Sequence, residues 1–363
     1  METYLVGGAV RDMLLELPVT ECDWVVVGST PAEMKAAGYT QVGKDFPVFL
    51  HPETREEYAL ARTERKVRPG HSGFECDANQ QITLEQDLGR RDLTINAIAQ
   101  NQQGDLIDPY GGCADIKSRT LRHISDAFSE DPLRILRVAR FAARFSHLGF
   151  HISDETRKLC QTMVVRGDLN ELSPERIFQE MDKALATDNP EIFFNFLHEI
   201  SASSQLWPEL DSSLLESLDN SAVSTNNAQR YALLFLQTSV DKINIRSHLL
   251  RTPRRYRELA AICSEHQDSF LKVQELDPEQ VVEFLYQLDA IRRPARFTEF
   301  CDTCHHVVMR RGLESGQKKT LINFYSVVSN ISSANVEACV TGAEMGKAIK
   351  KLQIQAVRSN NEN

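Results

Sequence analysis

The chain has 363 residues, 42% hydrophobic and 25% charged, which is typical of a soluble globular protein and long enough for two or three domains. Its formal net charge of −10 excludes a protein that binds nucleic acid through overall positive charge, so any such surface must be a local patch. No apolar run approaches the roughly 20 residues of a membrane span, and the N-terminus lacks a signal-peptide pattern. The eight cysteines are scattered, which suits free thiols in a reducing compartment. We therefore expect a cytoplasmic protein without a membrane segment.

The first two dozen residues combine a glycine turn with two closely spaced carboxylates. An apolar strand runs into Gly7-Gly8, and the helix that follows carries Arg11. A second strand then opens with Glu21 and Asp23, which project from the same face because side chains alternate along a strand. Backbone amides at a helix N-terminus bind phosphate, and paired carboxylates bind a divalent cation. This arrangement indicates a site that holds a metal ion and a triphosphate together, the layout of a nucleotidyltransferase.

The pattern of apolar residues changes along the chain. Short strands are expected at 24–27, 48–50, 57–61, 95–99 and 106–107, separated by turns. From about residue 129 the spacing becomes helical. Ser129 is expected to cap the first long helix, and Ser173-Pro174 to begin another. We therefore predict a small α/β head followed by an all-helical remainder.

The helix predicted from residue 129 concentrates positive charge. At 100° per residue, an arc of about 120° contains four arginines: Arg134, Arg137, Arg140 and Arg144. These charges repel one another, so the face needs a polyanion or acidic partners, unless it is simply solvated. Asp131 lies one turn before Arg134 on the same side. An Asp acceptor beside an Arg donor matches the Watson–Crick edge of cytosine or adenine, but not that of guanine or uracil.

Three further segments follow the opening motif in order: RRDLTINA at 90–97, DPYGG at 108–112 and EDPLRILRVARF at 130–141. With this order and spacing, the chain up to about residue 185 resembles the class II tRNA nucleotidyltransferases, the bacterial CCA-adding enzymes of the DNA polymerase β superfamily, and also bacterial poly(A) polymerases. The resemblance implies a nucleotidyltransferase head over 1–120, a helical neck with the nucleotide-selecting helix over 121–185, and a tRNA-binding helical body and tail over 186–363.

The resemblance also implies a reaction and its metal ions. CCA-adding enzymes build or repair the 3′-terminal CCA of tRNA from CTP and ATP without a nucleic-acid template and release pyrophosphate, using two Mg²⁺ ions. Glu21 and Asp23 take the metal-binding positions, and Glu57 on a neighbouring strand is the candidate third catalytic carboxylate. Most of the family has Asp at both metal-binding positions. Glu21 is one methylene longer, and we expect it to reach the ion and activity to survive.

Further roles are implied for the nucleotide itself. Gly8 lets the backbone approach the triphosphate, and Arg11 clamps its oxygens, although an isolated glycine pair is more often an ordinary turn. Arg91 and Asp92 resemble the family's ribose-reading pair. Asp92 would accept from a 2′-hydroxyl and so favour ribonucleotides; the alternative is a salt-bridged helix cap.

The neck helix carries the remaining implied contacts. Asp131 and Arg134 match the pair that the family uses as a protein template for the base. Arg137 and Arg140 match its triphosphate-contacting arginines.

Three alternatives remain open. A poly(A) polymerase shares the head, but such enzymes usually carry a strongly basic C-terminal extension. A relative that adds only CC or only A would differ partly in the loop at 62–77. A catalytically inactive RNA-binding module would follow if Glu21 could not hold metal.

Beyond residue 185 the resemblance weakens. Many relatives carry a phosphohydrolase domain marked by a His-Asp doublet, and no such doublet occurs in this sequence, so phosphatase activity is not expected. The stretch from Cys301 to His306 contains a CxxCH motif, but neither haem nor zinc is expected, because no signal peptide and no second ligand cluster accompany it. A helix with Cys304 as a small core residue is the expected structure.

Overall fold

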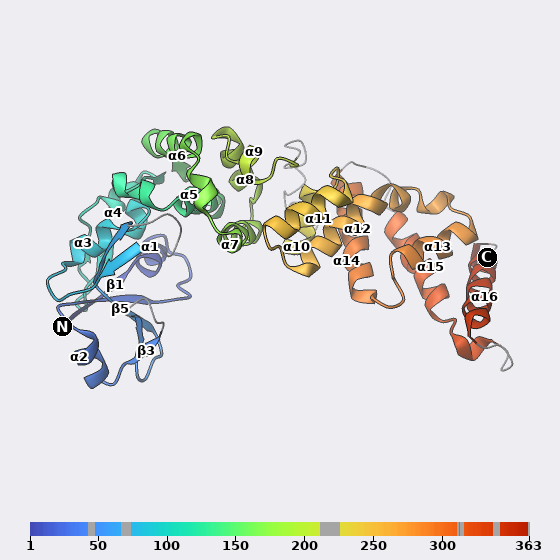
Figure 1. Cartoon of the computed structure of the whole chain (residues 1–363), viewed down its shortest axis with the longest axis horizontal. Helices are drawn as coiled ribbons and strands as arrows, with labels where there is room; N and C mark the ends of the chain where they lie inside the picture. The colour runs from blue at the N-terminus through green and yellow to red at the C-terminus, as the bar shows by residue number, and fades with distance from the viewer. Residues whose placement is uncertain are drawn as a thin grey trace. The chain divides into compact units, whose positions relative to one another are not determined.

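The computed structural model describes residues 1–42, 48–66, 74–210, 226–310, 312, 316–336 and 342–361 (Figure 1). Its backbone forms two compact units, residues 1–206 and 207–363. Residues 67–73, within the loop expected to distinguish full from partial CCA addition, lie outside the described residues. No helix in the described ranges is long and apolar enough to cross a membrane.

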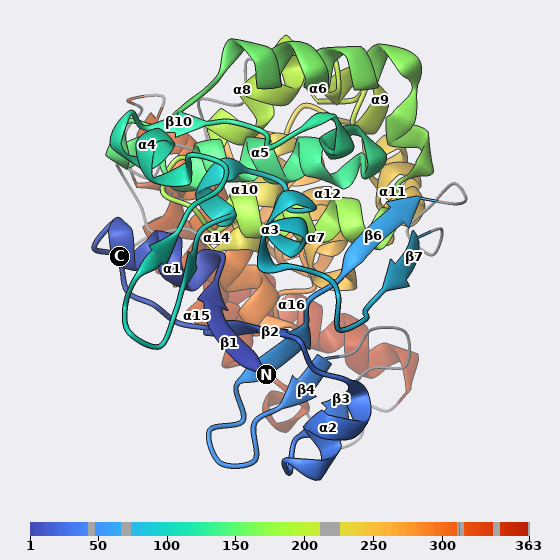
Figure 2. The same cartoon turned by 90° about the vertical axis from the view of Figure 1, so that its left-hand side faces the viewer.

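The main sheet of the first unit has seven described strands in the order β3-β4-β5-β2-β1-β8-β9. Strands β1 and β2 run antiparallel beside one another (Figure 2), whereas β2 and β5 are parallel. The strand bounds in this unit are β1 Glu2–Val6, β2 Asp23–Val27, β3 Thr40–Val42, β4 Val48–Leu50, β5 Glu57–Leu60, β6 Thr63–Lys66, β7 Phe74–Asp77, β8 Ala99–Gln100, β9 Leu106–Ile107, β10 Thr120–Leu121 and β11 His151–Ile152.

Strand β2 is central because both of its faces are buried. Val25 and Val26 point to opposite faces and are each 1% exposed. Val25 packs in a cluster with Leu88 of helix α3 (Leu84–Gly89), and Val26 packs in another with Met34 of α2 (Pro31–Ala36). The continuous apolar run in β2 is therefore explained by cover on two sides. This burial fixes the strand whose first residue is Asp23.

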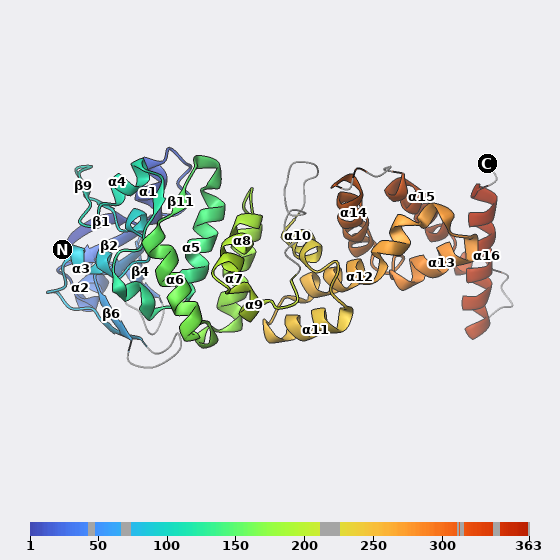
Figure 3. The ribbon, with the colours of Figure 1, turned by 90° about the horizontal axis from the view of Figure 1, so that it is seen from above.

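Helices follow the sheet and complete the first unit. Helix α5 packs against α7 and α8 (Figure 3). The remaining helix bounds in this unit are α1 Gly8–Leu14, α4 Gly112–Lys117, α5 Leu133–Arg144, α6 Asp154–Arg166, α7 Pro174–Leu185, α8 Glu191–Glu199 and α9 Ser203–Leu206. The expected α/β head followed by helices is confirmed, with one small exception, the two-stranded parallel pair of β10 and β11.

Two local expectations are wrong. Helix α5 begins at Leu133, and Ser129 lies in a preceding 3₁₀ turn, where its hydroxyl donates to the Asp126 carbonyl at 2.8 Å. The side chain of Asp131 instead accepts from the backbone N–H of Leu133 at 3.1 Å. The strand expected at 95–99 is largely replaced by a 3₁₀ turn at Thr94–Asn96.

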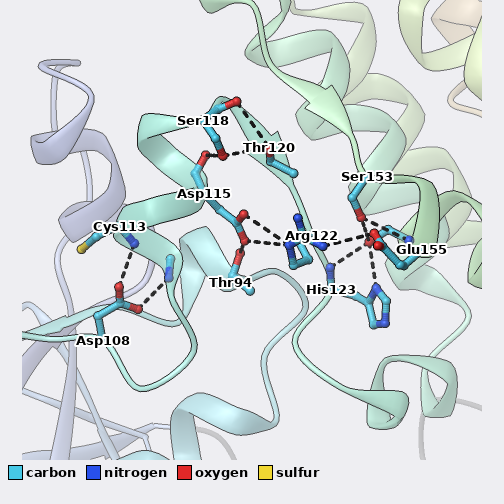
Figure 4. Close-up of polar contacts among 12 residues, drawn as sticks. Thr94, Asp108, Cys113, Asp115, Ser118, Thr120, Arg122, His123, Ser153 and Glu155 are labelled. Atoms are coloured by element: carbon cyan, nitrogen blue, oxygen red, sulfur yellow. Dashed lines mark hydrogen bonds and ion pairs between the residues drawn. The ribbon is translucent and has the colours of Figure 1, made fainter.

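The DPYGG segment, residues 108–112, packs under that 3₁₀ turn. The Asp108 carboxylate accepts from the backbone N–H groups of Gly112 and Cys113 at 2.7 and 2.8 Å (Figure 4). A Cβ at Gly112 would lie 2.2 Å from the Thr94 carbonyl oxygen, so glycine is required for this close approach.

A polar network joins the same turn to the neck. Asp115 accepts from the Thr94 hydroxyl at 2.7 Å and from Arg122 at 3.3 Å, and Arg122 also pairs with Glu155 at the start of α6 at 3.1 Å (Figure 4). The turn that contains Asn96 is therefore held by Asp115 of α4, which Arg122 links to Glu155 of α6.

The second unit is helical in its described residues, and α12 packs against α10, α11 and α14. Its helices are α10 Asn227–Leu234, α11 Val240–Leu249, α12 Arg254–Leu271, α13 Pro278–Gln287, α14 Pro294–Arg310, α15 Gln317–Ser329 and α16 Ala343–Asn361. The helix expected around the CxxCH motif is α14, and Cys304 is buried in it as expected. Burial raises the pKa of the Cys301 thiol well above its ordinary value, so this cysteine is a neutral packing residue.

Candidate active site

A cleft of about 800 Å³ in the first unit is lined by residues of the sheet and of helices α1, α5 and α7. Ten Arg or Lys and six Asp or Glu side chains line it, an excess of four positive charges in a chain with a net charge of −10. The cleft is therefore a local basic patch, as expected of any nucleic-acid-binding surface on a chain with a negative net charge. All the residues expected to bind metal or nucleotide lie in its lining: Gly8, Arg11, Glu21, Asp23, Glu57, Arg91, Asp92, Asp131, Arg134, Arg137 and Arg140.

The glycine turn at the end of β1 has one position that the fold itself restricts. Gly7 has a φ of +69°, and a Cβ there would lie 2.6 Å from Nη1 of Arg91. At Gly8, the first residue of α1, a Cβ would make only an ordinary contact of 3.5 Å with Arg11. The protein therefore requires glycine at Gly7, whereas any requirement at Gly8 must come from a bound ligand.

The carboxylates meet at one end of the sheet. Val6, just before the glycine turn, pairs with Asp23 in the antiparallel register of β1 and β2. In the parallel register of β2 and β5, Asp23 pairs with Glu57. Glu21 precedes β2 and lines the same cleft. The sheet register thus brings Glu57 beside Asp23, and Glu21, two residues before Asp23, lines the same cleft.

Electrostatics at this end favour a cation. Desolvation in the cleft raises the pKa of Asp23 and so does the charge of Glu21, while Arg91 opposes the shift. A divalent cation would relieve this clustering of negative charge, and carboxylate oxygens are the ligands that hard cations prefer. The described residues contain no preformed group of three or more metal-binding side chains. One or two carboxylates completed by phosphate oxygens and water is, however, the usual pattern for Mg²⁺.

Asp92 is buried and held from several directions. Its Oδ1 accepts from the backbone N–H of Leu93 and from Nδ2 of Asn96, both at 2.8 Å, and its Oδ2 accepts from Nε of Arg137 at 2.6 Å. Burial alone would raise the pKa of Asp92, but Arg137 and these hydrogen bonds hold it well below its ordinary value. Asp92 is thus a fixed carboxylate anion in the cleft.

Two of the arginines that were expected to bind nucleotide already form contacts within the protein. Arg11 is 3% exposed, contacts Asp12 at 2.8 Å and donates to Oδ1 of Asn96 at 2.5 Å. Arg91 pairs with Asp87 at 3.3 Å beside the glycine turn. Both line the cleft, but their guanidinium groups are also structural.

The arginines of α5 have acidic or carbonyl partners within the first unit, as repulsion between them requires. Arg140 pairs with Glu180 of α7 at 2.5 Å, and Arg144 pairs with Asp12 at 2.9 Å. Arg134 donates to the carbonyls of Ala127, at 3.1 Å, and Arg90. The face is therefore organised rather than simply solvated.

The partner of Asp131 is a residue that the sequence did not indicate. Arg176 of α7 donates to both oxygens of Asp131, at 3.3 and 2.8 Å. Glu180 lies one turn further along α7. This helix therefore supplies a partner for Asp131, which lies just before α5, and a partner for Arg140 within α5. The helix start at Ser173-Pro174 is confirmed. The i, i+4 spacing of Arg176 and Glu180 predicts an ion pair within the helix and gives no signal for these contacts with other segments.

Known proteins with similar sequences are numerous. The family described as "Poly A polymerase head domain" matches residues 3–122, and "Probable RNA and SrmB- binding site of polymerase A" matches residues 149–214. The multifunctional CCA protein of Shewanella frigidimarina is 43% identical, over 100% of this chain and 97% of that protein. That of Thioalkalivibrio sulfidiphilus is also 43% identical, over 99% of this chain and 98% of that protein.

Solved structures agree in fold. A CCA-adding enzyme in its apo form II has a TM-score of 0.74 at 22% identity, over 98% of this chain and 87% of that chain. A Thermotoga maritima CCA-adding enzyme complexed with tRNA has a TM-score of 0.69 at 22% identity, over 98% of this chain and 86% of that chain. The chain is 43% identical to a multifunctional CCA protein over its full length, and its first part matches the Poly A polymerase head family. It therefore belongs to the bacterial CCA-adding nucleotidyltransferase family.

Proposed function

We propose that the protein is a tRNA nucleotidyltransferase that adds or repairs the 3′-terminal CCA of tRNA, using CTP and ATP and releasing pyrophosphate. The observation that carries this proposal is the single cleft that contains the carboxylates, the glycine turn and the Asp131 region together. The 43% identity to multifunctional CCA proteins supports it. Because tRNA is the substrate, we propose the cytoplasm as its compartment.

Divalent metal ions are general in this family, and we propose Mg²⁺ held by Glu21 and Asp23, with Glu57 beside them. All three are hard oxygen ligands at one end of the sheet. When bound, such ions polarise the reacting phosphate and stabilise the attacking and leaving oxygens. The proximity of Asp23 and Glu57 in the strand register supports the choice of Glu57.

The remaining roles concern the nucleotide. Arg137 and Arg140 of α5 face the cleft and bind phosphate oxygens. Asp92 accepts from the ribose 2′-hydroxyl, and Arg91 and Arg11, which lie beside the glycine turn, bind the triphosphate near Gly8.

The nucleotide base is selected by residues of the neck, 121–185. Asp131 accepts from the exocyclic amino group of cytosine or adenine, and Arg134 donates to the neighbouring ring nitrogen. Cytosine and adenine share this donor–acceptor order, which uracil and guanine do not present. The work is divided among a catalytic head at 1–120, a selecting neck at 121–185 and a tRNA-binding body and tail at 186–363.

The alternative is a poly(A) polymerase, which the name of the matching head family favours, or a relative that adds only CC or only A. The test is incubation of the protein with tRNA that lacks CCA, with CTP and ATP singly and together. Full CCA addition requires two additions from CTP alone and a third when ATP is also present. Long adenosine tails, or products that stop after CC, would contradict it.

A further inference from the structure

Asp131 lies just before α5, and contacts with both α5 and α7 hold its side chain. Its Oδ1 accepts from the backbone N–H of Leu133 at 3.1 Å and from Nη1 of Arg176 at 3.3 Å. Its Oδ2 accepts from Nη2 of Arg176 at 2.8 Å. The pair is largely buried, with 25% of the Arg176 side chain and 19% of the Asp131 side chain exposed. Such a bidentate contact fixes the plane of the carboxylate as well as its position.

These contacts limit what else Asp131 can accept. A carboxylate has about four acceptor positions, two on each oxygen. Both positions on Oδ1 and one on Oδ2 are used in this structure. One position on Oδ2 therefore remains for a ligand in the cleft that Asp131 lines.

Asp92 repeats this arrangement. Leu93 and Asn96 occupy its Oδ1, and Arg137 occupies one position on its Oδ2. Each of the two aspartates is thus held by a backbone N–H and an arginine so that a single acceptor position is left. A hydroxyl or an amino group needs only one such position.

The place of Arg176 in its helix is otherwise unfavourable. It is the third residue of α7, after Pro174 and Glu175, and its backbone N–H already bonds to the Ser173 carbonyl. A cation in the first turn of a helix opposes the helix dipole. The ion pair with Asp131 offsets this unfavourable interaction.

From these contacts we infer that Arg176 is a positioning residue for base selection, which acts by restricting Asp131 to one acceptor. This inference rests on the proposed function. Guanine presents two adjacent donors, its ring N–H and its amino group, and an unrestrained carboxylate binds both at once. With Arg176 in place, Asp131 accepts only the single amino donor of adenine or cytosine. Arg176 therefore excludes guanine in particular.

The test measures kcat/KM for all four nucleotides with the full-length protein and two primers, tRNA without CCA and tRNA ending in CC. In Arg176→Ala, we expect the preference for ATP over GTP on the second primer to fall about ten- to a hundredfold, the value of one good bidentate contact. Arg176→Lys retains the charge but cannot donate from two nitrogens to both oxygens of Asp131, so its preference for ATP over GTP should also fall. Methylguanidinium added to Arg176→Ala should restore the preference.

Arg157→Ala is the matched control. Arg157 also joins two helices of the first unit by an ion pair, with Glu199, but it lies outside the cleft lining. Its selectivity should equal that of the unaltered protein. Thermal unfolding of each variant separates loss of fold from loss of selectivity.

A double variant tests whether Arg176 acts through Asp131. If it does, adding Arg176→Ala to Asp131→Ala changes selectivity little beyond Asp131→Ala alone. Equal slowing of all four nucleotides in Arg176→Ala, with selectivity intact, would overturn the inference and make Arg176 a phosphate-binding or structural residue. If the unaltered protein adds no nucleotide to either primer, the proposed function fails instead.

Discussion

The carboxylate Oδ2 of Asp92 lies 2.6 Å from Nε of Arg137, and this contact joins the segment after α3 to helix α5. The Asp92 side chain is 6% exposed and that of Arg137 is 34% exposed. A charge buried to this degree needs its partner, because an unpaired buried carboxylate has lost its hydration without compensation. The same pair places the proposed ribose-reading and phosphate-binding residues side by side.

Arg137→Ala should therefore destabilise the fold. Loss of one partner of a buried pair costs about 3–5 kcal/mol, and we expect the lower end because Arg137 retains some exposure. Urea unfolding at pH 7 gives this free energy. Arg144→Ala is the control, since Asp12 keeps Arg11 as a second partner, and it should cost less. Equal losses in the two variants would contradict this account.

The direction of the Asp92 pKa shift decides how this ion pair affects stability at different pH values. The pKa of Asp92 is lowered in the fold, so its ion pair stabilises the protein above the ordinary Asp pKa and is lost as the pH falls below it. Without Arg137 the folded-state pKa of Asp92 rises towards or above its unfolded value, so Arg137→Ala should lose less stability than the unaltered protein as the pH falls. Unfolding free energies measured between about pH 3 and pH 7 compare the two proteins.

Asp23→Asn should abolish nucleotide incorporation without lowering stability. The folded-state pKa of Asp23 is raised, so the fold disfavours its charge and the protein loses stability as the pH rises through that pKa. At pH 7 the neutral amide relieves this cost, and the melting temperature should stay the same or rise. Activity near that of the unaltered protein would contradict the metal assignment.

Glu21→Asp introduces the residue that the resemblance implies at this proposed metal-binding position. We expect turnover to stay unchanged or to increase, because Asp also supplies carboxylate oxygens to a metal ion. Initial rates over a range of Mg²⁺ concentrations measure this. An inactive Glu21→Asp protein would show that the site depends on the longer side chain.

The two glycines of the turn separate a structural role from a ligand role. Gly7→Ala forces a side chain into a left-handed conformation and against Arg91, so we expect a loss of about 1–3 kcal/mol in stability. Gly8→Ala should leave stability unchanged, because the protein leaves room for a Cβ there, and should raise KM for nucleotide, because the proposed triphosphate approaches that backbone. Urea unfolding and steady-state kinetics on both variants decide this, and destabilisation by Gly8→Ala would contradict it.

Helix geometry explains what the sequence could predict. The spacing of the α5 arginines fixes their common face without any tertiary information, and the face was placed correctly although α5 begins at Leu133. The start was misplaced because Asp131, not Ser129, bonds to the first turn.

Contacts between distant segments could not be read in this way. Asp131 and Arg176 are 45 residues apart, and their pairing depends on how α5 and α7 pack. Asp23 and Glu57 meet only through the register of β2 and β5. The likeness to a known family supplied Glu57 as a candidate, whereas nothing in the local spacing around Asp131 pointed to Arg176 as its partner.

The central claim is that side chains of this protein, rather than a nucleic-acid template, choose the base. Its most direct test is kcat/KM for CTP, ATP, UTP and GTP in Arg134→Ala and Arg137→Ala on the same tRNA primers. We predict that Arg134→Ala lowers the preference for CTP and ATP over UTP and GTP by about ten- to a hundredfold, since a bidentate base contact is worth about 1–3 kcal/mol. Arg137→Ala should weaken all four nucleotides about equally. If Arg134→Ala slows every nucleotide by one common factor, Arg134 only supports the carbonyls of Ala127 and Arg90, and the claim is wrong.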